Sequence, residues 1–412
     1  MFLTKLALKN LTRHKKRTII TAFVISFGIF IFLVSDSLMV GMSDLTIDNS
    51  INLQTGHLQV MKEEYWENKD ELPMNNLIEE DSNIINDIKN TVSSDNYTSR
   101  LLFGATINNG SEDYPINAIG IKPDDDQKVF DLKEYILEGE MFTGGQNVVI
   151  GKGLADLMGF NVGDYATLLF RTEEGTFNTI DAQLSGVIDA PHPEINEFHV
   201  YLPLQLAQDS LNIGNKVSKY LFRLGERDKS ITAANNLNAL FNDNGSNLHA
   251  YNWEQLSQEL LAMIQQGNIE NMIMLIIIIV LATVGVINTV ILSALERLEE
   301  IGMMKALGLK VREIVYIFVI ESTGIGIIGS FFGVLIGSIG VYFMSNYGLS
   351  VSSMTEGQST FGIPIADKLY GGWEISTFIF IFFFGILVSI LASILPAIWG
   401  AKKDPVKAIY HK

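Results

Sequence analysis

MIMLIIIIVLATVGVINTVIL, residues 272–292, is the stretch that decides the fold, because no charged side chain interrupts it. The hydrocarbon core of a bilayer is about 30 Å thick, so a helix of about 20 apolar residues crosses it. Three further apolar stretches of this length occur at 19–40, 314–344 and 377–399. The sequence therefore predicts a membrane protein with four transmembrane α-helices.

The segment between the first and second apolar stretches has a different composition. Residues 41–271 carry 14 Lys and Arg against 36 Asp and Glu, a net charge of −22, in a chain whose formal net charge is −17. Alternating apolar patterns such as Gly56–Val60 predict strands, and the pattern at 82–92 predicts a helix. We expect a large α/β domain inserted between helices 1 and 2, with an inserted subdomain at about 126–215.

Basic residues beside the spans predict the orientation in the membrane, because Lys and Arg are retained on the cytoplasmic side. Residues 1–18 carry six Lys and Arg and no acid, and the tail after Trp399 carries four Lys against Asp404. Both termini are therefore expected in the cytoplasm and the acidic domain outside. The predicted segments are a cytoplasmic N-terminus at 1–18, TM1 at 19–40, the extracytoplasmic domain at 41–270, TM2 at 271–294, a cytoplasmic coupling helix at 295–312, TM3 at 313–345, an extracytoplasmic loop at 346–374, TM4 at 375–399 and a cytoplasmic tail at 400–412.

Several classes of function are disfavoured by the sequence. The chain has no cysteine, which excludes disulfides and thiolate metal sites. The acidic domain argues against nucleic acid, whose phosphates are neutralised by Lys and Arg. Residues 145–153 do not have the spacing or the Ser/Thr of a phosphate-binding loop. The first apolar stretch is longer than the core of a cleavable signal peptide, so we expect an uncleaved anchor.

Two groups of polar residues are candidates for chemistry. His192, Glu194, Glu197 and His199 are of the types that bind zinc, but a polar loop entering a strand at 198–202 explains them better, and no metal site is expected. Asp36 and Glu321 lie within apolar stretches, where a charge is costly and marks a functional residue by default. Either takes part directly in transport, or it forms a pair inside the helix bundle or at its interface.

The connection LERLEEIGMMKALG, residues 295–308, is the most informative short segment. Leu295, Leu298 and Ile301 recur at helical spacing, which predicts a short amphipathic helix at the membrane surface, closed by Gly308. The helix serves either as an ordinary linker or as a docking element for a cytoplasmic partner. In the third span, Gly329, Gly333 and Gly337 recur every four residues, a spacing that permits close helix packing.

Four segments together resemble the FtsX-like permeases, the four-span membrane subunits of ABC transporters that include MacB and LolCDE. The first is the 295–308 connection. The others are 10–18 before the first span, 148–164 in the outer domain and 396–409 at the C-terminus. Within the family, Thr55–Val60 after a long first span is most similar to the LolC/LolE branch, which releases lipoproteins. The resemblance implies a MacB-like periplasmic core in the outer domain and a multi-pass protein of the bacterial inner (cytoplasmic) membrane.

The resemblance also implies a non-catalytic permease subunit. A separate LolD- or MacB-type ATPase would bind ATP and Mg²⁺, a second permease would form a homo- or heterodimer with this chain, and this chain would bind no cofactor. Membrane lipids, lipoprotein cargo and a periplasmic carrier would be further partners. The alternatives are a MacB-type mechanotransmission or efflux permease for peptides, and an FtsX-type regulator of a cell-wall hydrolase. The implied ATPase-coupling residues are Glu296, Arg297, Glu300, Ile301, Gly302, Lys305 and Gly308.

The ends of the first two apolar stretches suggest where acyl chains would bind. Flexible methionine side chains suit a pocket for variable lipid tails. Simple packing of the two helices against each other is the competing interpretation. The candidate residues for a lipid or cargo cavity are Met39, Val40, Met42, Met263, Ile264 and Met272.

Overall fold

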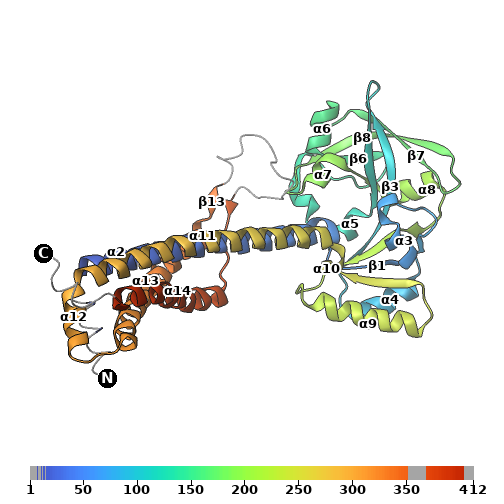
Figure 1. The fold of residues 1–412 in the computed structure, drawn as a ribbon. Helices are drawn as coiled ribbons and strands as arrows, with labels where there is room; N and C mark the ends of the chain where they lie inside the picture. Colours follow the sequence, from blue (N-terminus) through green and yellow to red (C-terminus); the bar gives the residue numbers. More distant parts are fainter. Residues whose placement is uncertain (1–6, 8–10, 12, 14, 351–367, 403–412) are drawn as a thin grey trace. The chain divides into compact units, whose positions relative to one another are not determined.

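The computed structural model describes residues 7, 11, 13, 15–350 and 368–402 (Figure 1). The chain divides into two compact units. The membrane unit contains Met1–Asp44, Met263–Ser352 and Asp367–Lys412, and the α/β unit contains Leu45–Ala262 and Ser353–Ala366. Each unit has its own buried apolar core, so each is described separately below.

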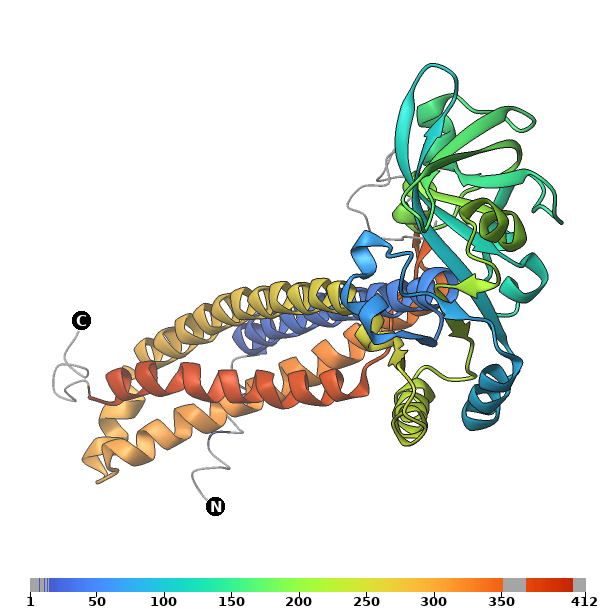
Figure 2. The ribbon, with the colours of Figure 1, turned by 90° about the vertical axis from the view of Figure 1, so that its right-hand side faces the viewer.

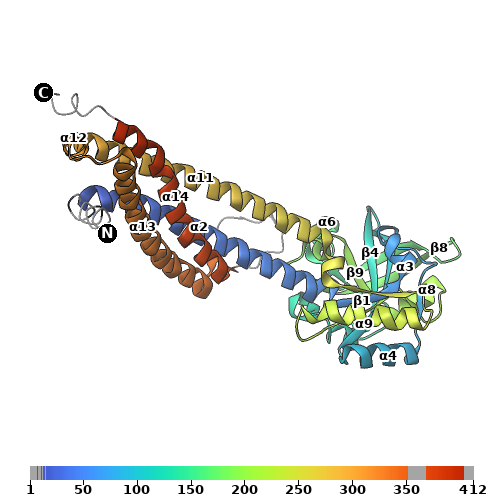
Figure 3. The ribbon, with the colours of Figure 1, turned by 60° about the horizontal axis from the view of Figure 1, so that its bottom comes forward.

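The membrane unit is a bundle of long helices, which run side by side in Figures 2 and 3. Four helices in the described residues are long and apolar enough to cross a membrane. A short helix connects the second of these to the third, and two short strands follow the third and precede the fourth. The elements are α2 (Lys15–Ser50), α11 (Gln258–Glu296), α12 (Leu298–Ala306), α13 (Val311–Tyr347), β13 (Leu349–Ser350), β14 (Lys368–Leu369) and α14 (Ile375–Lys402).

The first two long helices extend well beyond the apolar stretches that predict them. α2 continues past residue 40 to Ser50, and α11 begins at Gln258 rather than near 271. Within the membrane unit, the extension of α11 packs on α2: a Cβ added to Gly267 would overlap Cε of Met39. The apolar stretch therefore reports the thickness of a bilayer, whereas helix–helix packing decides where the helix ends.

The α/β unit is built on a ten-stranded sheet with strand order β12-β1-β11-β3-β4-β9-β6-β8-β5, in which β7 pairs with both β3 and β8. The strands are β1 (Leu58–Lys62), β3 (Tyr97–Asn108), β4 (Asp113–Ile121), β5 (Ile136–Gly139), β6 (Asn147–Gly151), β7 (Tyr165–Arg171), β8 (Phe177–Ile188), β9 (His199–Pro203), β11 (Lys219–Phe222) and β12 (Leu248–Asn252). The segment 126–215, predicted as an inserted subdomain, supplies β5 to β9 and so continues the same sheet.

Helices and short turns cover the sheet. α4 and α9 lie side by side near β1 (Figure 3) and cover the face that buries Leu58, Val60 and Phe222. The remaining elements are η1 (Ile51–Thr55, a π-helical turn), α3 (Glu63–Glu67), η2 (Lys69–Glu71), β2 (Ile78–Glu79), α4 (Ser82–Val92), α5 (Pro123–Asp126), η3 (Leu132–Tyr135), α6 (Lys152–Met158), α7 (Pro193–Phe198), α8 (Leu204–Leu211), β10 (Lys216–Val217), α9 (Lys229–Asp243) and α10 (Trp253–Leu256).

Local sequence signals explain two of these elements. The β3–β4 hairpin turns at Asn109-Gly110, where Gly110 has φ +93° and the Asn109 side chain accepts the backbone N–H groups of Ser111 and Glu112. The segment before β9, interpreted from the sequence as a loop, is instead the helix α7. Pro193 at its first turn favours a helix start, because proline needs no N–H partner there.

Candidate functional site

The connection between α11 and α12 is a sharp break at one residue. Arg297 has φ −112° and ψ 21°, outside helical geometry, so the chain turns there from the long α11 into the short α12. The helix ends at Ala306, and Gly308 follows with φ +93°, its N–H donating to the carbonyl of Lys305. This left-handed glycine is the helix terminator that the sequence indicates. Leu295, however, belongs to α11 and is 44% exposed.

A buried ion cluster joins this break to two other helices. Glu321 of α13 has a side chain only 5% exposed. Its Oε1 accepts from Nη2 of Arg17 at 3.0 Å, and its Oε2 accepts from Nη1 of Arg297 at 3.0 Å. Arg17 also donates through Nη1 to Glu296 at 3.1 Å. Two arginines and two glutamates therefore balance in charge and connect α2, α11, the α12 break and α13, and we call these four residues the ion cluster.

One further ion pair lies at the edge of this region. Nη1 of Arg13 donates to Oε1 of Glu300 at 3.1 Å, with side chains 68% and 42% exposed. An exposed pair of this kind contributes about 0–1 kcal/mol, because water screens it. The buried ion cluster, rather than this pair, therefore holds the start of α12 in place.

The predicted coupling residues differ in how deeply they are buried. Arg297, Ile301 and Gly302 are buried, Glu296 and Glu300 form ion pairs within the unit, Lys305 is half-buried and Gly308 is exposed. Between residues 298 and 308, the most exposed large apolar side chains are those of Met303, 56% exposed, and Leu307, 82% exposed. The sequence interpretation did not include these two residues. Their spacing of four residues on a helix was the signal that could have identified them.

The glycines of α13 form a groove for α2. A Cβ added at Gly333 would lie 2.8 Å from Cβ of Ile29, and one at Gly329 would lie 2.9 Å from Cβ of Ile25. At Gly337 the nearest atom would be Cδ1 of Leu33, at 2.5 Å. The three α2 side chains are also four residues apart, so this row of side chains fits into the groove that the α13 glycines form.

Replacing Gly333 with alanine is expected to destabilise the membrane unit by about 1–3 kcal/mol, because the added methyl group overlaps Ile29 and approaches the backbone of Ser26. Gly285→Ala in α11 is the matched control. A Cβ there meets only Cγ1 of Val24, at 3.4 Å, an ordinary contact, so the change should be neutral or stabilising. Thermal unfolding of the two purified variants tests this expectation. Equal melting temperatures of the two variants would contradict it, and would show that α2 and α13 can move apart to make room for the methyl group without a loss of stability.

The second intramembrane charge also has partners within the membrane unit. Nδ2 of Asn271 donates to Oδ1 of Asp36 at 2.8 Å, and Ser35 lies 3.5 Å from Oδ1 of the same asparagine. Both Asp36 and Glu321 thus form the bundle pairs that were one of the two sequence interpretations.

The six candidate residues for a lipid cavity lie on the C-terminal half of α2 and the N-terminal half of α11. Met39 covers Gly267, and Val40 covers Gly372, whose added Cβ would lie 2.5 Å from Val40 Cγ1. Met263 and Met272 are 43% and 63% exposed, while Met42 and Ile264 are half-buried. The exposed methionines are available to a ligand, and Met39 and Val40 already have packing roles.

The structure shows how the zinc-type residues of the α/β unit are arranged. Across the described residues, no group of three or more His, Cys, Asp or Glu side chains is arranged to hold a metal ion. Oε1 of Glu194 lies 3.7 Å from Nε2 of His199, and the side-chain amide of Gln54 donates to Glu194. The nearby His199 imidazole lowers the pKa of Glu194 to about 2, and burial lowers the pKa of His192 to about 4.

Comparison with known proteins identifies the class of both units. The model of the MacB-like periplasmic core domain matches residues 18–240, and that of the FtsX-like permease C-terminal region matches residues 272–405. The chain therefore belongs to the family of FtsX-like ABC transporter permeases with a MacB-like periplasmic core domain. Such permeases work with a cytoplasmic ATPase, and the chain is a membrane protein with a periplasmic-type domain.

Three of the similar proteins illustrate the likeness. An uncharacterized ABC transporter permease of Methanocaldococcus jannaschii is 29% identical over 32% of this chain and 30% of its own length. The lipoprotein-releasing system transmembrane protein LolC of Xylella fastidiosa is 22% identical over 74% of this chain and 75% of its own. The extracellular domain of the noncanonic ABC-type transporter YknZ from Gram-positive bacteria is 16% identical, covering 48% of this chain and 100% of that one, with a TM-score of 0.34.

Proposed function

We propose that this chain is the membrane subunit of an inner-membrane ABC system that releases lipoproteins, driven by a separate ATPase and acting with a second permease. The similarity to LolC extends over about three quarters of both chains and supports this branch of the family. The permease transmits force and hydrolyses no ATP itself. Its termini and α12 face the cytoplasm, as the basic residues beside the spans predict.

The ion cluster is the observation that carries the mechanism. An ATPase that binds the exposed side of α12, at Met303 and Leu307, would push on a helix whose first turn is fixed through Arg297 to Glu321. Glu321 also holds Arg17, at the start of α2. α2 is a single helix from Lys15 to Ser50, so a displacement at its start is transmitted along its whole length. ATP hydrolysis would thus move the segment that leads into the α/β unit.

One cavity inside the membrane unit supports motion of the helices rather than conduction of cargo between them. A cavity among α2, α11 and α14 has a volume of only about 30 Å³. Its lining is apolar apart from Ser389, and it includes Ile25, Leu275 and Phe384. This volume is about that of one water molecule, and apolar cavities stay dry. A lipid-linked cargo would therefore be handled at the outer surface of the spans, where Met263 and Met272 are exposed.

A photoreactive amino acid at Met263 is expected to capture an acylated lipoprotein in membranes that contain the complete, ATP-hydrolysing complex. Leu391, 58% exposed on α14, is the matched control position, at which much less lipoprotein should be captured. Mass spectrometry of the crosslinked products measures both. Equal capture at Met263 and Leu391 would show that the exposed methionines do not form the cargo site. If an active complex yields no lipoprotein at either position, the proposal of lipoprotein release is wrong. Co-purification of a periplasmic adaptor would then favour a MacB-type efflux permease.

A further inference from the structure

One face of the α/β sheet carries a row of polar side chains across neighbouring strands. In the strand register, Lys219 of β11 lies opposite Arg100 of β3, and Asn117 of β4 lies opposite His199 of β9. Leu102 of β3 pairs with Ile119 of β4, which places Arg100 and Asn117 on the same face, because side chains alternate along a strand. The opposite face holds the apolar core with Leu101 and Tyr220. The polar row therefore lies on the face away from α4 and α9.

The pairing of Arg100 with Lys219 is unusual, because like charges directly opposite each other destabilise a sheet. Arg100 is compensated: its Nε and Nη2 donate to the two carboxylate oxygens of Asp126 at 2.8 and 2.9 Å, and both side chains are 4% exposed. The ring of Phe130 lies 3.6 Å from the guanidinium carbon. Lys219 has no comparable partner.

Among the described residues, Lys219 forms neither an ion pair nor a side-chain hydrogen bond. Lys219 as a whole is half-buried, at the wall of a cavity. Burial of its ammonium group lowers the pKa to about 7; the nearby Arg100 and Lys69 act in the same direction, and Glu194 opposes them. An amine that is withdrawn from water without an ion pair or a hydrogen bond is costly to keep in its charged form. The sheet thus holds an amine whose charged form has no anionic partner within the part of the chain that the structure describes.

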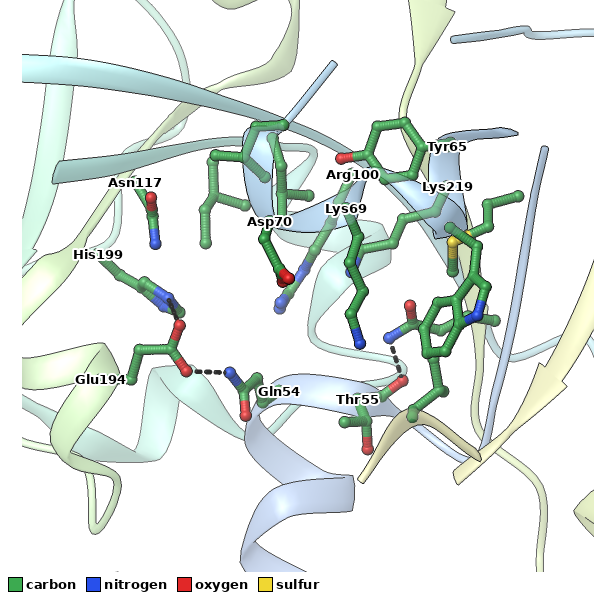
Figure 4. Close-up of a pocket in the computed structure, with 17 residues that line it drawn as sticks. Gln54, Thr55, Tyr65, Lys69, Asp70, Arg100, Asn117, Glu194, His199 and Lys219 are labelled. Carbon is green, nitrogen blue, oxygen red and sulfur yellow. Dashed lines mark hydrogen bonds and ion pairs between the residues drawn. The ribbon is translucent and has the colours of Figure 1, made fainter. Parts of the chain in front are cut away.

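A cavity of about 400 Å³ opens over this row. In Figure 4 the side chains of Lys69, Asp70 and Arg100 converge on its middle, and Lys219 extends toward them from the side of Tyr65. Glu194 and His199 form one wall. The charged and titratable groups around Lys219 are therefore Arg100 on β3, Glu194 on α7, Lys69 and Asp70 on η2, His199 on β9 and Tyr65 on α3.

We propose that this cavity binds an oxyanion, a carboxylate or phosphate group of a small ligand, between Lys219, Arg100 and Lys69. Glu194 does not occupy the place of that anion, because Gln54 and His199 already hold its carboxylate at the wall. Asp70 repels additional negative charge, so the site suits one localised anionic group. Binding in this cavity goes beyond the proposed transport function and does not depend on it.

The proposal makes a specific prediction about protons. At pH 8 the free Lys219 is mostly neutral, and an anion beside it favours the charged form, so binding raises the pKa and takes up a proton. Isothermal titration calorimetry of the full-length protein at pH 8, in two buffers of different ionisation enthalpy, measures that uptake. The probes are acetate, a carboxylate, and sulfate, a stand-in for phosphate. Neither probe titrates near this pH, and the probe that binds more tightly distinguishes the two chemical classes.

Variants at Lys219 decide the outcome. Lys219→Met should weaken binding at least tenfold and abolish proton uptake, whereas Lys219→Arg should bind without proton uptake. Lys128→Met, which removes an exposed lysine of the same unit, is the matched control and should bind as the unchanged protein does. Failure of both probes to bind saturably would overturn the proposal. So would a Lys219→Met variant that retains the full affinity and proton uptake.

Discussion

Replacing Glu321 with glutamine is expected to lower the free energy of unfolding of the membrane unit by about 3–5 kcal/mol. In the unchanged protein, both the Arg17 and the Arg297 guanidinium lie 3.0 Å from the Glu321 carboxylate. The change leaves the buried Arg297 without its carboxylate partner and leaves Arg17 paired with Glu296 alone. ATP hydrolysis by the assembled complex should also become uncoupled from cargo release. Thermal unfolding in lipid nanodiscs and a release assay measure the two effects.

Glu300→Gln is the matched control for stability, because it breaks the exposed pair with Arg13 and should change the unfolding free energy by less than about 1 kcal/mol. The triple variant Arg17→Met, Arg297→Met and Glu321→Leu separates stability from coupling. An apolar replacement of a buried ion group commonly restores stability, so this variant should fold well. It should remain uncoupled, and normal release by it would show that the ion cluster transmits no force.

Asp126→Asn is expected to destabilise the α/β unit by about 3–5 kcal/mol. Asp126 accepts both hydrogen bonds of the Arg100 guanidinium, and the asparagine variant leaves that cation buried beside Lys219 without a balancing charge. The purified full-length variant should show a lower melting temperature for this unit. The expected effect is large because the Arg100 side chain, only 4% exposed, loses its carboxylate partner.

The neighbouring residue provides a control on the same short helix. Asp125 pairs with Lys128, whose side chain is 47% exposed, so Asp125→Asn should cost less than about 1 kcal/mol. Similar melting temperatures for the Asp125 and Asp126 variants would contradict this expectation. They would mean that water stabilises the Arg100 guanidinium once Asp126 is replaced, although the side chain is buried in the unchanged protein.

Much of the architecture follows from local patterns. The four spans are detectable because a bilayer requires about 20 apolar residues of any helix that crosses it. The helix at 82–92 and the hairpin at Asn109-Gly110 are encoded by apolar spacing and turn chemistry within a few residues. Their physical causes are local, so a single sequence is sufficient to find them. The helix α7 was missed because its six residues are too short to show a helical period.

The candidate sites depend on contacts that no local pattern contains. Sequence reasoning identified Glu321 as an unusual charge, but its partner Arg17 lies 304 positions away. No pattern in the sequence indicates a role for Lys219, since an isolated lysine is ordinarily a solvated surface residue. Its candidate role is recognisable only in the folded structure, where strand pairing places it opposite Arg100 in the lining of a cavity.

By itself, then, the sequence determined the four spans, the acidic α/β domain between the first two and the glycine spacing of the third, since each reflects the chemistry of neighbouring residues. Only the tertiary structure decided which charges meet: Arg17 and Arg297 on Glu321 in the bundle, and Arg100 beside an unpaired Lys219 in the sheet. The physical reason is that the energy of a buried charge depends on its neighbours in space, and folding brings those neighbours from distant parts of the chain.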